Sequence, residues 1–218
     1  MSLSVAEAVR PLSVAMKEGS MTEHAAAEHS PFVSELLAGQ VNERGYADYL
    51  LRLRAVYGAL ESVIRIHSDD PLVAAVFDPA LERLPAIDAD LDHWLPGGAR
   101  EVVSPAVDAY RDRITDATWG GALVAHHYTR YLGDLSGGQI IGKILNRTFG
   151  LDGCGLAFYY FPVRAKPFKD SYRARLDGLS LDADAMDRTV NEVRVAFGLN
   201  QALFDELAQS LPAYRRRP

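Results

Sequence analysis

Residues 126–143 constrain the fold more than any other segment, because their flanks have helical periodicity while their interior holds four glycines. The glycines stand at positions Gly133, Gly137, Gly138 and Gly142. An interior glycine destabilises a helix by about 1 kcal/mol relative to alanine, so four would cost roughly 3–4 kcal/mol. That is a large part of the stability of a typical domain. A helix that keeps these glycines needs a compensating interaction.

Three explanations for the glycines can be compared. A second helix could pack closely against them, since residues four apart lie on one helix face. A phosphate-binding loop is excluded, because the segment has no P-loop or Rossmann pattern and no strand precedes it. A flat ligand could lie directly on the backbone, because glycine permits close approach and a local kink. The spacing alone leaves the first and third explanations open.

Asp134 lies among these glycines. A buried carboxylate needs a hydrogen-bonding partner or water, so in a ligand site Asp134 could order a water network. A solvent-exposed aspartate is the alternative, and the sequence does not separate the two.

A second segment, residues 17–29, places His24 and Glu28 one helical turn apart on the same face. A carboxylate there could accept the imidazole proton that does not face a metal ion. Lys17, two turns earlier, could meet an anionic group on a large ligand. His29 lies about 140° around the helix from His24, which does not favour one shared ion. The ordinary alternative for each histidine is a surface or hydrogen-bonded side chain.

The hydrophobic pattern predicts an all-α fold in a single compact domain over residues 1–218, with a core at about 12–207 and a basic tail at 213–218. In the long helix, Tyr46, Leu50, Leu53, Tyr57, Leu60 and Ile64 should form one buried face. Ser30 and Pro31 are typical of a helix N-cap followed by the first helical residue. Residues 150–169 should form a structured loop with a short extended piece. Helices are expected at 11–29, 31–38, 43–67, 79–94, 105–117, 122–148, 168–176 and 183–210.

Charge and cysteine content exclude several classes of protein. A net charge of −6 argues against a general nucleic-acid binder. The single Cys154 excludes an internal disulfide, a cysteine zinc site and an all-cysteine iron–sulfur cluster. The chain has no Glu-x-x-His motif, which disfavours a ferritin-type di-iron site. With no signal peptide and only short apolar runs, we expect a cytoplasmic monomer without a membrane anchor.

Four segments carry a resemblance to a known family. YTRYLGDLSGGQ at 128–139 resembles the signature of the haem oxygenases, and TEHAAAE at 22–28 resembles their proximal-histidine helix. FKDSYRAR at 168–175 and AFGLN at 196–200 also match. The resemblance spans nearly the whole chain and points to the soluble bacterial branch. Ser20 and His29 depart from the threonine and asparagine that animal members often carry there.

The resemblance implies roles for individual residues. His24 would be the axial ligand of the haem iron with Glu28 as its partner, and Asp134 would organise distal water. Gly133 and Gly137 would contact the distal haem face, and Gly138 would help the helix bend. The cations that hold the propionates would be Lys17, Lys169 and Arg173. Other pocket or distal-network residues would be Tyr57, Tyr128, Arg130, Phe197 and Asn200.

The resemblance also implies a reaction, in which haem b is both cofactor and substrate. O2 and electrons would cleave it at the α-meso carbon to biliverdin IXα, CO and ferrous iron. No flavin or nicotinamide motif occurs, so the electrons should come from a ferredoxin or a flavoprotein reductase. The rival hypotheses are a non-enzymatic haem binder and another enzyme on a helical scaffold. A thiaminase-like enzyme would need Cys154 as its nucleophile.

Overall fold

The computed structural model describes residues 10–216, and over this range the regular structure is helical apart from one isolated bridge between Val41 and Arg215. The all-α prediction is therefore confirmed. The α-helices are α1 Leu12–Gly19, α2 Met21–Glu28, α3 Pro31–Leu37, α4 Glu43–Ile66, α5 Pro71–Val76, α6 Leu84–Trp94, α7 Pro105–Thr115, α8 Gly120–Gly133, α9 Gln139–Phe149, α10 Ala165–Asp177, α11 Ala183–Ala208 and α12 Leu211–Tyr214. The shorter elements are the 3-10 turns η1 Pro79–Leu81 and η3 Ala157–Tyr159, and the π-helical turn η2 Asp134–Gly138.

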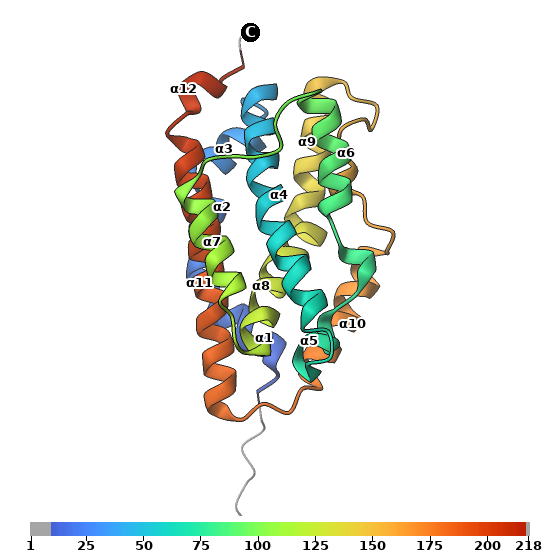
Figure 1. The fold of residues 1–218 in the computed structure, drawn as a ribbon, viewed down its shortest axis with the longest axis vertical. Coiled ribbons are helices and arrows are strands. Elements are labelled where there is room, and N and C mark those ends of the chain that lie inside the picture. The colour runs from blue at the N-terminus through green and yellow to red at the C-terminus, as the bar shows by residue number, and fades with distance from the viewer. Residues whose placement is uncertain (1–9, 217–218) are drawn as a thin grey trace, which may run out of the picture.

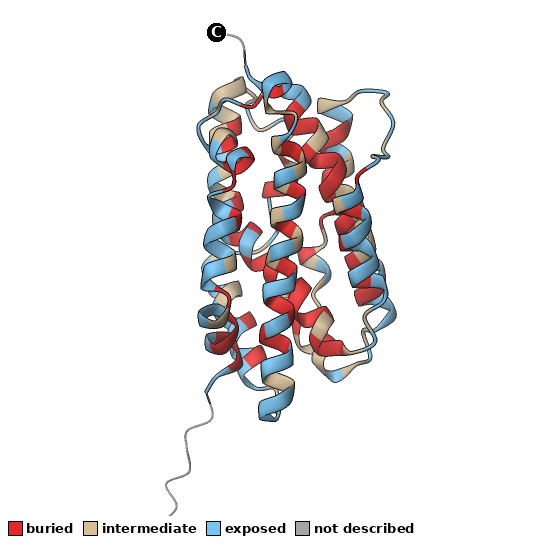
Figure 2. Cartoon of the chain, turned by 90° about the vertical axis from the view of Figure 1, so that its left-hand side faces the viewer, coloured by how far each residue is buried: buried red, intermediate tan, exposed pale blue. Residues whose placement is uncertain are grey.

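The two longest helices, α4 and α11, run along the long axis of the molecule (Figure 1). Helices α6 and α7 pack on α4, while α2, α3 and α8 pack on α11. The predicted inner face of α4 is fully buried, and the buried residues of the helices face inward (Figure 2). Its members are Tyr46, Leu50, Leu53, Tyr57, Leu60 and Ile64.

The prediction of one continuous helix at 11–29 was wrong, because the chain forms two helices with a break at Ser20. Ser20 has φ −120°, and its hydroxyl donates to the carbonyl of Met16. Beside the break, a Cβ on Gly19 would lie 2.4 Å from Val190 of α11, so only glycine permits this approach. Arg194 of α11 donates to the freed carbonyl of Gly19 over 2.6 Å. Contacts with a distant helix therefore set the break.

The helix expected at 122–148 consists of α8, η2 and α9. A π turn inserts one residue into an α-helix and bends it, so the predicted kink takes this form. The expected short extended piece in residues 150–169 is wrong, because that loop holds the 3-10 turn η3 and leads into α10. The range 79–94 divides into η1 and α6, while α5 and α12 were not predicted. Ser30 precedes α3 but makes no side-chain cap hydrogen bond.

The chain ends lie partly outside the described range. Arg215 pairs with Val41, and Arg216 donates its backbone N–H to the carbonyl of Gln40 over 2.9 Å. The expectations for residues 1–9 and for Arg217 and Pro218 lie outside the described residues. Between residues 10 and 216, no helix combines the length and apolar character needed to cross a membrane.

Candidate functional site

A cavity of about 430 Å³ lies between α2, α3, α8, η2 and α11. This volume falls within the range of small-molecule sites. Nine of the predicted site residues line it: His24, Glu28, Arg130, Gly133, Asp134, Gly137, Gly138, Phe197 and Asn200. The other five predicted residues, Lys17, Tyr57, Tyr128, Lys169 and Arg173, are not among its lining residues.

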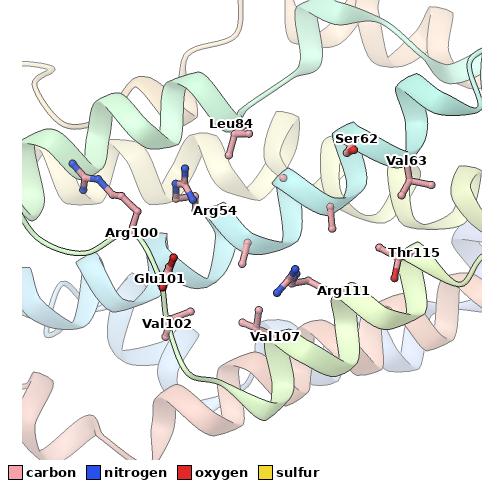
Figure 3. Close-up of a pocket in the computed structure, with 13 residues that line it drawn as sticks. Arg54, Ser62, Val63, Leu84, Arg100, Glu101, Val102, Val107, Arg111 and Thr115 are labelled. Carbon is pink, nitrogen blue, oxygen red and sulfur yellow. The ribbon is translucent and has the colours of Figure 1, made fainter.

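A larger cavity of about 560 Å³ lies between α4, α6, α7 and the linker that joins α6 to α7. Figure 3 shows Arg54, Glu101 and Arg111 around it. Its lining contains no histidine, and Arg54 and Arg111 lie within ion-pair distance of Asp88 and Asp108. None of the predicted site residues lines it, so the smaller cavity is the candidate site.

Gly133 of α8 and Gly137 of η2 differ from Gly142 of α9 in what surrounds them. A Cβ built on Gly133 or Gly137 would meet no atom within 4 Å, and both residues line the cavity. A Cβ on Gly142 would lie 2.9 Å from the ring of Tyr159, which is a close packing contact. Close packing therefore explains Gly142. It does not explain Gly133 and Gly137, which leave bare backbone facing open space.

A buried polar cluster surrounds Asp134. The Tyr57 hydroxyl donates to Oδ2 of Asp134, and it accepts from Nε of Arg130 over 3.1 Å. The Arg130 guanidinium also lies 3.7 Å from Oδ1 of Asp134 and donates to the Asn200 amide oxygen. Four side chains from α4, α8, η2 and α11 thus hold one another beside the cavity.

The carboxyl of Asp134 is 10% exposed. Burial raises its pKa, while the charge of Arg130 and the hydrogen bond from Tyr57 partly offset that rise. A carboxyl with a raised pKa, beside a cavity, is suited to holding and passing a proton.

The opposite side of the cavity carries His24 on α2. Its Nδ1 lies 3.6 Å from Oε2 of Glu28, as the spacing predicted, and its ring packs edge-on against Phe197 at 5.2 Å. The side chains of His24 and Glu28 are 50% and 58% exposed. With Glu28 beside Nδ1, the imidazole has Nε2 available for a metal ion.

Helix α11 connects the two sides. It packs against α2 and against α8, and it contributes Phe197 beside His24 and Asn200 beside Arg130. The spacing between the imidazole and the distal cluster is therefore fixed by one continuous helix.

The predicted cations lie on two neighbouring helices. Lys169 of α10 donates to the Ser136 hydroxyl of η2 over 2.8 Å, and Arg173 lies 3.3 Å from Asp170. Lys17 is exposed on α1, which packs beside α10. Arg173 is also close enough to Tyr128 for its charge to affect the pKa of that phenol. Lys169 therefore lies against η2, and Arg173 lies near Tyr128 of α8.

The sequence missed a third part of the wall, contributed by Tyr49, Phe158 and Tyr159. Asp90 of α6 accepts the backbone N–H groups of Ala157 over 2.6 Å and Phe158 over 2.8 Å, which fixes η3 against the cavity. The sequence FYYF at 158–161 is an aromatic cluster, which is a local signal for part of this wall. Other missed lining residues are Ala27, His29, Val33, Ser34, Leu36, Leu37, Thr129, Ile140, Ile141 and Phe204.

The histidines of α8 are structural, as predicted. His126 contacts Glu192 at 3.0 Å, and His127 contacts the Tyr172 hydroxyl at 2.8 Å. Across residues 10–216, no group of three or more His, Cys, Asp or Glu side chains is arranged to hold a metal ion.

Comparison with known proteins gives consistent results. The family model described as "Heme oxygenase" matches residues 10–206. "Heme oxygenase 1" of Nostoc is 39% identical over 203 residues, covering 90% of this chain and 85% of that protein. The human "Heme oxygenase 1" is 38% identical over 209 residues, covering 92% and 73%. The solved structure of heme oxygenase-1 from Synechocystis in complex with heme aligns with a TM-score of 0.89 and 36% identity, over 94% of this chain and 95% of that one.

Proposed function

The chain belongs to the haem oxygenase family of haem-degrading enzymes, and we propose that it cleaves haem b at the α-meso carbon to biliverdin IXα, CO and ferrous iron. The observation that carries this proposal is the bare backbone of Gly133 and Gly137 in the cavity that also holds His24. A flat macrocycle needs such a surface on one face and an axial ligand on the other. The residues present therefore fit haem.

On the proximal side, Nε2 of His24 would bind the haem iron, with Glu28 orienting the ring through Nδ1. When bound, the iron of the substrate supplies the O2 and electron chemistry of the reaction. An imidazole binds a metal ion in its neutral form, so acid that protonates an imidazole ligand weakens metal binding.

On the distal side, Asp134 would hold water and deliver protons to the cavity. Tyr57 donates to its carboxylate, and Arg130 opposes its charge, so the carboxyl keeps one orientation. The closely approaching backbone at Gly133 and Gly137 would restrict where a small ligand can lie above the ring.

At the edge of the cavity, Lys17, Lys169 and Arg173 would hold the propionates and so set the rotation of the ring. That rotation would select the meso carbon nearest the distal water. We also propose a separate ferredoxin or flavoprotein reductase as the electron donor. The cytoplasmic location, the monomeric state and the single domain over 1–218 stay predictions.

The experiment that tests the function is titration of the protein with hemin, followed by reductive turnover with ascorbate or a reductase in air. The expected result is a Soret band distinct from that of free hemin, which disappears as biliverdin absorption rises. A stable Soret band that survives turnover would favour a non-enzymatic haem binder. A spectrum equal to that of free hemin would contradict the proposal.

The role of Asp134 is tested by Asp134→Ala. Because general acid–base groups contribute about 100-fold or more, biliverdin formation should fall by at least that factor while hemin still binds. Oxidation of an added peroxidase substrate should increase in its place. A normal biliverdin yield would remove Asp134 from the proposed mechanism.

A further inference from the structure

Three tyrosines lie on α4, and only one of them lines the cavity. Tyr46 and Tyr57 are fully buried, and their hydroxyls donate to Tyr159 and Asp134 respectively. Tyr49 is 6% exposed and belongs to the cavity wall, together with Asp134 and Arg130. Neither the family resemblance nor the helical pattern singled it out.

The ring of Tyr49 is held from several sides. Its centroid lies 5.7 Å from that of Phe32 on α3, 6.4 Å from that of Tyr46 and 6.1 Å from that of Phe204 on α11. Packing of this kind fixes the direction of a phenol, because the side chain has only two rotatable bonds. The hydroxyl therefore has a defined place in the cavity wall.

The charged and titratable groups near this hydroxyl come from four elements. They are Arg130 of α8, Asp134 of η2, the phenol of Tyr159 in η3 and the phenol of Tyr46 on α4 itself. Burial raises the pKa of Tyr49, and the charge of Arg130 lowers it only in part, so the phenol is neutral at physiological pH. A guanidinium has no acceptor, so towards Arg130 the phenol oxygen can only accept a hydrogen bond. The Tyr49 proton is then available to donate into the cavity.

The cavity lining also includes the apolar side chains of Val33, Leu36 and Phe204, and Phe204 packs against the Tyr49 ring. A donor on such a surface gives cavity water a second anchor, in addition to Asp134. Water held at two points is restricted to a smaller region than water held by the carboxylate alone.

We propose that Tyr49 is a positioning residue of the distal pocket, whose hydroxyl donates to cavity water and, with Arg130, extends the Asp134 cluster along the wall formed by α3 and α4. This inference rests on the proposed function. It adds a polar group to the distal side that the proximal and distal motifs do not contain.

The test is Tyr49→Phe, which removes one oxygen and keeps the ring. We expect the visible spectrum of the ferric, hemin-loaded protein to change with pH as a proton leaves the distal pocket, and the midpoint is the pH at which half of that change is complete. A hydroxyl that donates there stabilises the deprotonated form, so the midpoint should rise by about 0.5 pH in Tyr49→Phe, roughly a threefold change in the ionisation constant. In turnover, kcat should fall about threefold to tenfold with an unchanged KM for hemin.

Two further variants make the test specific. Tyr172→Phe removes the same atom from a buried phenol on α10 that does not line the cavity, and its midpoint should equal that of the wild type. Tyr49→Leu removes the ring as well, which reports on packing. If Tyr49→Phe has the wild-type midpoint and kcat, or only Tyr49→Leu differs, the inference is overturned. If the wild-type protein binds no hemin, the proposed function is overturned, and this inference with it.

Discussion

Helix α2 presents His24 and Glu28 on side chains that are half exposed, whereas on the other side of the cavity Asp134 and Arg130 are 10% and 8% exposed. The distal cluster is complete within the protein, because each of its groups has a protein partner. The proximal imidazole has an apolar neighbour in Phe197 and a carboxylate at 3.6 Å. The difference teaches that the side with Asp134 is held together by protein groups alone, whereas His24, the proposed iron ligand, is held less completely by its protein neighbours.

The largest effect is expected on the proximal side, from His24→Ala. Loss of a metal ligand exceeds the roughly 10- to 100-fold cost of losing a ligand's supporting partner, so turnover should fall to background. The free energy of unfolding should change little, because the side chain is half exposed. Hemin titration checks the loss of the iron ligand, and denaturant unfolding checks the free energy of unfolding. Added imidazole should restore the Soret band. A strongly destabilised apoprotein would show that α2 depends on His24 for its fold.

The distal counterpart is Arg130→Leu, which leaves the buried carboxylate of Asp134 without its cation. Breaking a buried charge pair costs about 3 kcal/mol or more, so this variant should lose stability as well as turnover. Arg111→Leu is the matched control, because that side chain is half exposed and its effect should stay below about 1 kcal/mol. Equal unfolding free energies for the two variants would contradict a preformed distal cluster.

A third prediction concerns how α8 is anchored on its inner side by His127. Burial, together with the charge of Arg175, lowers the pKa of His127 from 6.5 to about 3. The unfolded chain therefore binds the proton first, and stability present above pH 6.5 is lost as the pH falls. By linkage the loss is about 2 kcal/mol between pH 7 and pH 5.

Unfolding of His127→Gln measured at both pH values checks this contribution. The variant should show a smaller loss on acidification than the wild type does. Parallel pH dependences would mean that His127 becomes protonated without unfolding.

The smallest effect separates the glycines of the distal helix. Gly133→Ala should raise the free energy of unfolding by about 1 kcal/mol, since a helical alanine is favoured and nothing lies within 4 Å. The same change should weaken hemin binding, because the methyl group enters the cavity. Gly142→Ala should instead lower stability, because its methyl would lie 2.9 Å from Tyr159. If both substitutions changed the free energy of unfolding in the same direction, the distinction between the cavity-facing Gly133 and the closely packed Gly142 would be wrong.

Much of the fold could be predicted because long amphipathic helices carry a strong periodic signal. The predicted range 43–67 differs from α4 only at its last residue, and the predicted range 183–210 contains α11. Periodicity does not report a break that depends on another helix, so the break at Ser20, where the preceding Gly19 lies against Val190, was missed. Asp70 and Pro71 do carry a local start signal, and the carboxylate of Asp70 caps α5. That short helix could have been found from the same pattern as Ser30 and Pro31.

The candidate site was predicted unevenly for a physical reason. His24 and Asp134 were found because their motifs are contiguous in the chain, and each motif folds as one helical segment. Tyr49 and Phe158 reach the cavity through tertiary packing. The hydrogen bond from the backbone of η3 to Asp90 joins residues that are far apart in sequence. No local pattern marks such residues.

The π turn at η2 has a consequence for how this helix can tolerate changes in length. One extra residue in the turn rotates everything that follows by about 100° relative to an uninterrupted helix. The buried residues of α9, Gly142 and Leu145, face the interior of the protein only because of that rotation. An insertion or deletion of a single codon between Gly133 and Gln139 would therefore turn α9 about its own axis. Point substitutions in the same stretch would leave the phase of α9 intact.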